Sequence, residues 1–171
     1  NGQSKKPLSS VQTSEVQPSA NKESSLDPEL FVRAHSPRIG NSMARVVVVE
    51  WLDPECEACR AMHPFVKKIE AEYKDRVLFV TRYMPYHGGS HFAISILEEA
   101  RELDKFDEAL DIIFEKQPEW GSHQNPNPDL IPSYLTKIGI PKERLEKDRI
   151  IQKHQKTVEM DKEDGEKVGV R

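Results

Sequence analysis

The sequence predicts an α/β fold built around one strand–helix–strand unit. Two β-rich runs, Val46–Trp51 and Val77–Tyr83, flank a segment whose apolar residues recur at helical spacing. The same spacing continues from His91 to about Lys167, which predicts a long helical region. Two strands joined by a helix pair in parallel through a right-handed crossover. We therefore expect a parallel βαβ unit followed by helices that supply core stripes.

Length and composition favour a single domain with a polar N-terminal extension. The chain has 171 residues, a formal net charge of −4 and 32% charged residues, and its basic residues alternate with acidic ones. That alternation is typical of solvated helix faces and disfavours a nucleic-acid partner. No apolar run approaches the roughly 18 residues of a membrane span. The chain begins Asn1-Gly2 without Met or an apolar leader, which favours a processed protein.

The first 28 residues are rich in Ser and Pro and poor in large apolar residues. Such a segment buries too little surface to offset its ordering entropy, so we interpret 1–28 as a disordered linker. An ordinary floppy terminus explains it equally well. The domain is expected to span 29–171, with Leu30–Ala34 as a short edge strand and Ser36–Asn41 as a turn.

The run Val46–Trp51 contains four consecutive valines without polar alternation. This pattern predicts a parallel strand covered on both faces. Glu50, near the end of this strand, is then expected to be buried. Burial raises the pKa of a carboxyl group, because it disfavours the charged form. The alternative is a surface charge just past the strand. Trp51 is expected to form part of the core or a cleft wall.

Cys56 and Cys59 are the only cysteines, and they lie where the predicted helix begins. Cys56 opens the helix and Cys59 follows one turn later on the same side. Unpaired N–H groups and the helix macrodipole favour a thiolate there, and a second thiol can resolve a mixed disulfide. A zinc site would need further ligands, yet the six histidines are scattered. A structural disulfide across so short a loop would stabilise little. The spacing therefore favours a redox pair.

The surrounding residues resemble the thioredoxin superfamily, and within it the DsbA-like thiol:disulfide oxidoreductases with a helical insertion. The resemblance covers about residues 36–171. Glu50 lies six residues before Cys56, where the family keeps a buried acid, and Pro64 lies five after Cys59, where the family kinks the helix. Arg82–Gly88 is similar to the family's R-Y-x-P-F-H-G stretch.

The resemblance implies a thioredoxin-like fold with a helical insertion at about 91–167, and disulfide exchange with protein thiols. Cys56 would attack, Cys59 would resolve, and Glu50 would exchange a proton with Cys59. No metal or organic cofactor is implied. An unidentified redox partner protein and a bacterial periplasmic or otherwise exported location are implied. Whether the protein oxidises, reduces or isomerises stays open.

In this family the chain continues through a Gly-Val-x-Gly-Thr-Pro-Thr segment with a cis proline, two antiparallel strands and a helix. The present sequence stops at Gly169-Val170-Arg171. We therefore expect the C-terminal strands to be missing from it, and no cis proline is assigned. Without them, Val46–Trp51 would become an edge strand with exposed apolar surface.

Several residues near the cysteines have two interpretations each. Glu57, between them, opposes a thiolate at Cys56, which predicts a less oxidising couple than that of relatives with His there. Glu55 either adds to this effect or is solvated. His63 is expected to be a partly exposed helix residue without a redox role. His87 either borders the active site or is a turn residue without a role, and the second interpretation is slightly favoured.

The stretch Gln117–Pro128, with Trp120 and three prolines, is predicted to be a loop. Trp120 either binds substrate there or anchors the loop. A rival function is a copper(I)-binding or chaperone module without turnover, since soft thiolates select copper(I). Its nearest additional ligands would be Met62 and His63, which the helix explains better.

Overall fold

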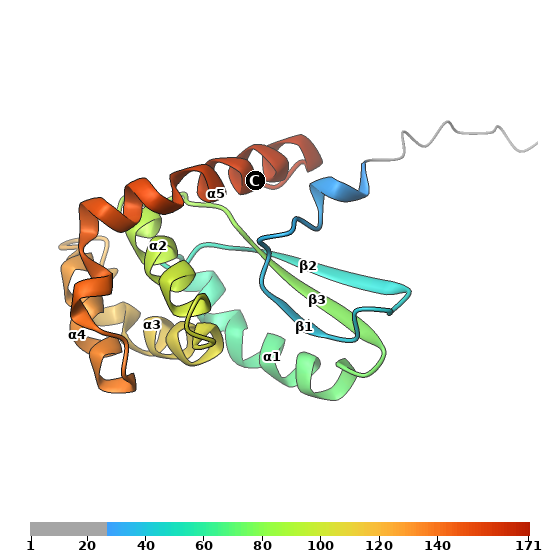
Figure 1. Ribbon diagram of the computed structural model, residues 1–171, viewed down its shortest axis with the longest axis horizontal. Helices are drawn as coiled ribbons and strands as arrows, with labels where there is room; N and C mark the ends of the chain where they lie inside the picture. The colour runs from blue at the N-terminus through green and yellow to red at the C-terminus, as the bar shows by residue number, and fades with distance from the viewer. Residues whose placement is uncertain (1–26) are drawn as a thin grey trace, which may run out of the picture.

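The computed structural model describes residues 27–171, so the predicted linker falls almost wholly outside the described residues. A small sheet lies at one end of the molecule and a group of helices at the other (Figure 1). The strands are β1 (Arg38–Gly40), β2 (Val46–Leu52) and β3 (Val77–Tyr83). The α-helices are α1 (Glu57–Tyr73), α2 (Ser90–Arg101), α3 (Phe106–Trp120), α4 (Ile131–Leu135) and α5 (Lys147–Val168). Short 3₁₀ turns are η1 (Pro28–Leu30), η2 (Pro128–Leu130), η3 (Thr136–Ile138) and η4 (Lys142–Leu145).

The sheet confirms the predicted βαβ unit. Its strand order is β1–β3–β2, with β2 parallel to β3 and β1 antiparallel to β3. The parallel register runs from Val46 opposite Val77 to Leu52 opposite Tyr83. Helix α1 connects these two strands, contains Pro64, and ends at Tyr73 as the apolar spacing predicts. The carboxyl ends of β2 and β3 therefore lie side by side.

The predictions for Leu30–Ala34 and Ser36–Asn41 were wrong. Instead of a strand at Leu30–Ala34, the chain forms the 3₁₀ turn η1, capped by Asp27, whose carboxylate accepts the N–H of Glu29. The predicted turn at Ser36–Asn41 contains strand β1, because the free edge of β3 offers backbone partners there. Gly40 closes this strand at a φ of +100°, where an added Cβ would collide with a backbone carbonyl.

Strand β2 is not covered on both faces, contrary to the prediction from its valines. Val46, Val47 and Val48 are 54%, 43% and 45% exposed. The reason is the strand order: among the described residues β2 pairs with β3 alone and forms an edge. The exposed apolar surface expected of such an edge is present, and further exposed side chains lie on α1, namely Met62, Phe65 and Ile69.

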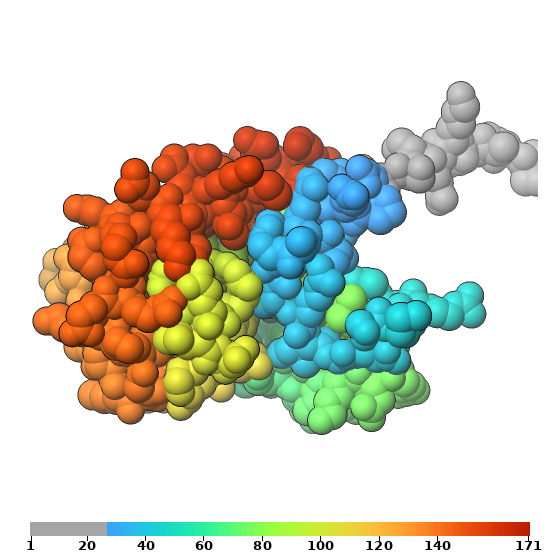
Figure 2. All heavy atoms as spheres, in the orientation of Figure 1, coloured from blue at the N-terminus to red at the C-terminus, as the bar shows by residue number. Residues whose placement is uncertain are grey.

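The hydrophobic core lies mainly among the helices. Helix α2 is buried along most of its length and packs against α5 and α3. In the space-filling view α5 and the segments before it wrap around α2 (Figure 2). Helix α3 continues through Pro118 to Trp120, so the predicted loop Gln117–Pro128 is shorter and covers only 121–127 before η2. The helices thus pack against one end of the βαβ unit.

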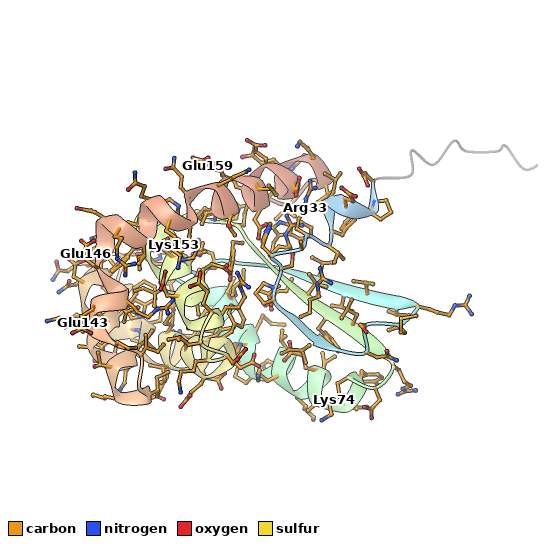
Figure 3. All side chains as sticks on the ribbon, viewed as in Figure 1. Arg33, Lys74, Glu143, Glu146, Lys153 and Glu159 are labelled. Carbon is orange, nitrogen blue, oxygen red and sulfur yellow. The ribbon has the colours of Figure 1, made fainter. Side chains whose placement is uncertain are left out.

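A buried ion network ties the C-terminal helix to the sheet. Arg82 on β3, which has no exposed surface, pairs with Asp161 and Asp164 of α5, and Arg33 pairs with Asp164 from the other side. Arg33 lies beside the C-terminal part of α5 (Figure 3). The Trp51 indole donates to the carbonyl of Asp161 at 3.3 Å. Trp51 is therefore part of this packed junction, as the sequence predicted.

Candidate active site

The two cysteines lie in the turn between β2 and α1 and in the first turn of α1. Cys56 is the N-cap of the helix, and its N–H donates to the carbonyl of Asp53 at 3.1 Å. No side chain caps this helix, so its first N–H groups face the Cys56 region and favour negative charge there. Both cysteines are free thiols and partly exposed. This arrangement is the one that the sequence predicts.

The environments of the two sulfurs differ. Cys59 packs against the hydrophobic core. Burial, together with the neighbouring Cys56 sulfur, raises the pKa of Cys59 to about 12. Cys59 is therefore almost entirely a thiol at neutral pH, and it needs a proton acceptor before it can act as a nucleophile.

Glu50 is the acid that the family resemblance pairs with Cys59. Its side chain is partly buried and lines a groove of about 90 Å³ between β2, β3 and α1, together with Val66 and Thr81. Burial raises the pKa of Glu50, and nearby His63 offsets part of that rise. Within residues 27–171 no hydrogen bond joins Glu50 to Cys59. Proton exchange between them therefore needs a bridging group.

Asp53 organises the loop after β3. It is buried, and its carboxylate accepts hydrogen bonds from the Tyr86 N–H at 2.8 Å, from His87 Nδ1 at 2.7 Å and from the Ser90 hydroxyl. It also accepts the N–H of Glu55 at 2.9 Å. One carboxylate thus holds both the turn before the cysteines and the loop that faces it.

Glu55 completes this connection. The interpretation of Glu55 as a solvated side chain was wrong, because it is buried and accepts the N–H of Gly89 at 2.7 Å. A Cβ at Gly89 would lie 3.0 Å from that carboxylate oxygen, so a larger residue would disturb the bond. No pattern in the sequence indicates this pairing, since the two residues lie on different segments.

Two histidines lie beside Glu57, the first of the two residues between the cysteines. His123 Nε2 lies 2.9 Å from the Glu57 carboxylate, and the rings of His87 and His123 are 5.5 Å apart. The helix's own N–H groups lower the pKa of Glu57, and His123 lowers it further. The hydrogen bond to Asp53 raises the pKa of His87. His87 is therefore more than a turn residue, because it is bonded to the buried Asp53. No pattern in the sequence indicated that His123 would lie near the cysteines.

Gln117 links helix α3 to the cysteine turn. Its amide nitrogen donates to the carbonyls of Pro54 at 2.8 Å and Cys56 at 3.0 Å. The sequence interpretation missed this residue because it assigned Gln117 to a loop. The helical region therefore positions the backbone on which Cys56 sits.

Two other predicted residues have structural partners. Trp120 has no exposed surface and its indole donates to the carbonyl of Ile113 at 2.9 Å, so it anchors the end of α3 and the substrate-binding interpretation is wrong. His63 lies 2.6 Å from Asp111 and joins α1 to α3. Met62 points to solvent. The additional copper ligands considered from the sequence therefore do not converge on the cysteines.

Comparisons with known proteins agree with this geometry. A family model described as "Thioredoxin" matches residues 33–171. The chain is 27% identical to BdbD from Bacillus subtilis, with a TM-score of 0.69, over 80% of this chain and 77% of that one. It is 23% identical to a thioredoxin-like oxidoreductase from Silicibacter pomeroyi, with a TM-score of 0.69, over 84% and 80% of the two chains.

A third similar structure is α-DsbA1 from Wolbachia pipientis, at 17% identity and a TM-score of 0.69, over 83% of this chain and 73% of that one. Comparison with curated protein sequences finds no match. Among the described helices none has both the length and the apolar character of a membrane span. The fold, the Cys-x-x-Cys pair at the start of α1 and the matched family together show that this chain belongs to the thioredoxin family, as a DsbA-like thiol–disulfide oxidoreductase.

Proposed function

We propose that the protein exchanges disulfides with protein substrates through Cys56 and Cys59. The observation that carries this proposal is the asymmetry of the pair: Cys56 caps the N-terminus of α1, whereas burial raises the pKa of Cys59 to about 12. One sulfur is positioned to attack and the other is held as a thiol until it is needed.

In the reducing direction the Cys56 thiolate attacks one sulfur of a substrate disulfide. A mixed disulfide forms and the substrate's other sulfur leaves as a thiolate, which takes up a proton. Cys59 then loses its proton and attacks the Cys56 sulfur. The Cys56–Cys59 disulfide closes and the substrate's second thiolate is released. Oxidation of a substrate dithiol is the reverse sequence.

Glu50 is assigned the proton exchange with Cys59. Burial raises the pKa of Glu50, which suits a carboxyl group that takes up and releases a proton during exchange. A water molecule would bridge the two groups. This role needs no organic cofactor.

The domain assignment and the cellular setting form part of the same proposal. Residues 29–171 form the oxidoreductase domain, with the helical insertion at about 91–167, and 1–28 act as a linker. The substrates are protein thiols and disulfides, and a separate redox protein restores the pair. An exported bacterial location suits a protein whose two cysteines must cycle through a disulfide.

Alkylation kinetics test the proposal. Cys56 of the reduced protein is expected to react with iodoacetamide at pH 5–6 at least tenfold faster than glutathione, because it caps the N-terminus of α1. Reduced Cys59→Ser is expected to accumulate a mixed disulfide with insulin, because Cys56 can attack an insulin disulfide but no second thiol can resolve the product. Cys56→Ser is expected to form no such mixed disulfide. A Cys56 that reacts no faster than glutathione would refute the assignment of the attacking sulfur.

A further inference from the structure

We propose that Glu57, His87 and His123 form a zinc-binding site beside the redox pair. One ligand atom from each of these three side chains lies within 4.8 Å of the other two. The residues come from three separate segments: the start of α1, the loop after β3 and the loop after α3. The fold therefore brings together three ligands that are far apart in the sequence.

The donor set is one that zinc uses. Two imidazoles and one carboxylate leave a fourth position for water, and zinc bonds to such ligands are about 2.0–2.2 Å long. Ligands on one tetrahedral ion are then roughly 3.4 Å apart. The His123 Nε2–Glu57 distance is already 2.9 Å. The His87 ligand atom lies within 4.8 Å of the other two, so it needs to approach them by at most about 1.4 Å to reach that spacing.

Asp53 provides an independent observation that points to a metal ligand. Its buried carboxylate bonds to Nδ1 of His87 at 2.7 Å and is itself fixed by backbone N–H groups. This bond orients the imidazole ring and leaves Nε2 for an outside partner. Carboxylate–histidine pairs of this kind orient histidine ligands in zinc sites and make them more basic.

Charge also favours a cation at this position. Three acidic side chains, Asp53, Glu55 and Glu57, act electrostatically on His87, and in residues 27–171 no lysine or arginine forms an ion pair with any of them. A second cluster, Glu99 with Glu102 and His154, has a similar composition. There Lys153 and Arg144 already occupy the position of a cation. Among the described residues no lysine or arginine takes that position beside Glu57, His87 and His123.

Two of the three proposed ligands are accessible to solvent. The His123 side chain is 64% exposed and that of Glu57 is 46% exposed, so an ion reaches them without unfolding. A bound ion would join the 121–127 loop to the start of α1, next to Cys56. The site uses neither thiol and does not depend on the proposed function.

The test is zinc titration of the oxidised protein, in which the Cys56–Cys59 disulfide removes both thiolates as ligands. Isothermal titration calorimetry with zinc chloride is expected to show one ion per chain. His123→Ala and His87→Ala should each weaken binding at least tenfold. His63→Asn is the matched control, because His63 also faces a carboxylate, that of Asp111, but has no third ligand. It should bind zinc as the wild type does.

Cobalt(II) provides a second measurement on the unaltered chain, which settles the question if a variant folds poorly. Paramagnetic shifts are expected at the ring protons of His87 and His123, and not at those of His35 or His154. Four results would overturn the proposal: no saturable zinc binding, equal affinity in His123→Ala, equal loss in His63→Asn, or displacement of zinc by equimolar calcium, which prefers oxygen ligands.

Discussion

The side-chain amide of Gln117 donates to the carbonyl oxygen of Cys56 at 3.0 Å and to that of Pro54 at 2.8 Å. These bonds hold the Pro54–Glu55 and Cys56–Glu57 peptide units, at the point where the chain enters α1. Gln117 belongs to α3, so the helical region acts on the redox pair through the backbone and not through a contact with sulfur.

Removing this link should loosen the cysteine turn. Gln117→Leu keeps the volume but leaves the Pro54 carbonyl without its donor, which costs about 1–3 kcal/mol in the least relaxed case, while the Cys56 carbonyl keeps the Arg60 N–H. We expect a lower urea midpoint and a three- to tenfold slower alkylation of Cys56. Gln155→Leu is the control, since Gln155 is exposed on α5 and bonds only to Glu159. An unchanged alkylation rate in Gln117→Leu would show that the turn holds its shape unaided.

Glu50→Gln tests the proton-exchange role. The substitution is nearly isosteric but removes the acceptor, so Cys59, with its pKa near 12, should attack the mixed disulfide at least tenfold more slowly. Rapid-quench measurement of mixed-disulfide decay reports this step directly. Glu70→Gln is the matched control, because Glu70 lines the same groove and burial also raises its pKa.

The same variant has a second expected effect, on stability. The folded-state pKa of Glu50 is raised, so ionisation above that pKa opposes folding. Glu50→Gln should therefore melt at a higher temperature than the wild type at pH 8, and the difference should disappear at pH 4. If Glu50 is a functional acid, the variant should show a slower resolution step together with a higher Tm. If Glu50 were a structural acid, its loss would lower both the rate of that step and the Tm.

Sequence patterns predicted the βαβ unit well because its signals are local. The runs Val46–Trp51 and Val77–Tyr83 agree with β2 and β3 to within one residue, and Cys56 lies at the helix start as expected. The exposure of Val46–Val48 was missed by the pattern itself, since four valines look alike whether a strand is central or at an edge. Burial depends on neighbouring strands, and the run does not encode these.

The surroundings of the cysteines were less predictable because they depend on long-range pairs. Asp53 meets His87, Glu55 meets Gly89, and Gln117 reaches across to Cys56. Each pair joins segments at least 30 positions apart, and no periodicity reports such a contact. The family resemblance pointed to the 82–88 loop as a unit, yet only the fold shows that two buried carboxylates hold it.

The charge of Glu57 should set part of the reduction potential. A carboxylate next to Cys56 disfavours the thiolate and so stabilises the disulfide, although the contact with His123 offsets some of this effect. Glu57→His should raise the potential by about 30 mV or more, which corresponds to about 1.4 kcal/mol. Equilibration with glutathione in the presence of EDTA measures it without metal. Glu72→Gln, at the far end of α1, should leave the potential unchanged, and a lower potential in Glu57→His would contradict the electrostatic account.

Acid stability should depend on Glu99, which has no exposed surface and is held by Lys153, His154 and Arg144. Lys153 projects from α5, and its ammonium group lies 2.6 Å from the carboxylate on α2 (Figure 3). Burial raises the pKa of Glu99, but these three hydrogen bonds lower it more, to about 2.

Because the folded-state pKa lies below the ordinary value of 4.5, the unfolded chain takes up the proton first as the pH falls. The stability from Glu99 is therefore fully present above about pH 4.5 and is lost progressively down to about pH 2. Glu99→Gln should lower the unfolding free energy at pH 7 by about 2 kcal/mol, allowing for solvent at the partly exposed Lys153 and Arg144. Urea titrations at pH 7, 4 and 2.5 should show the gap from wild type closing, while the exposed control Glu159→Gln shows no gap. A gap that stays constant with pH would mean that Glu99 acts through packing and not through its charge.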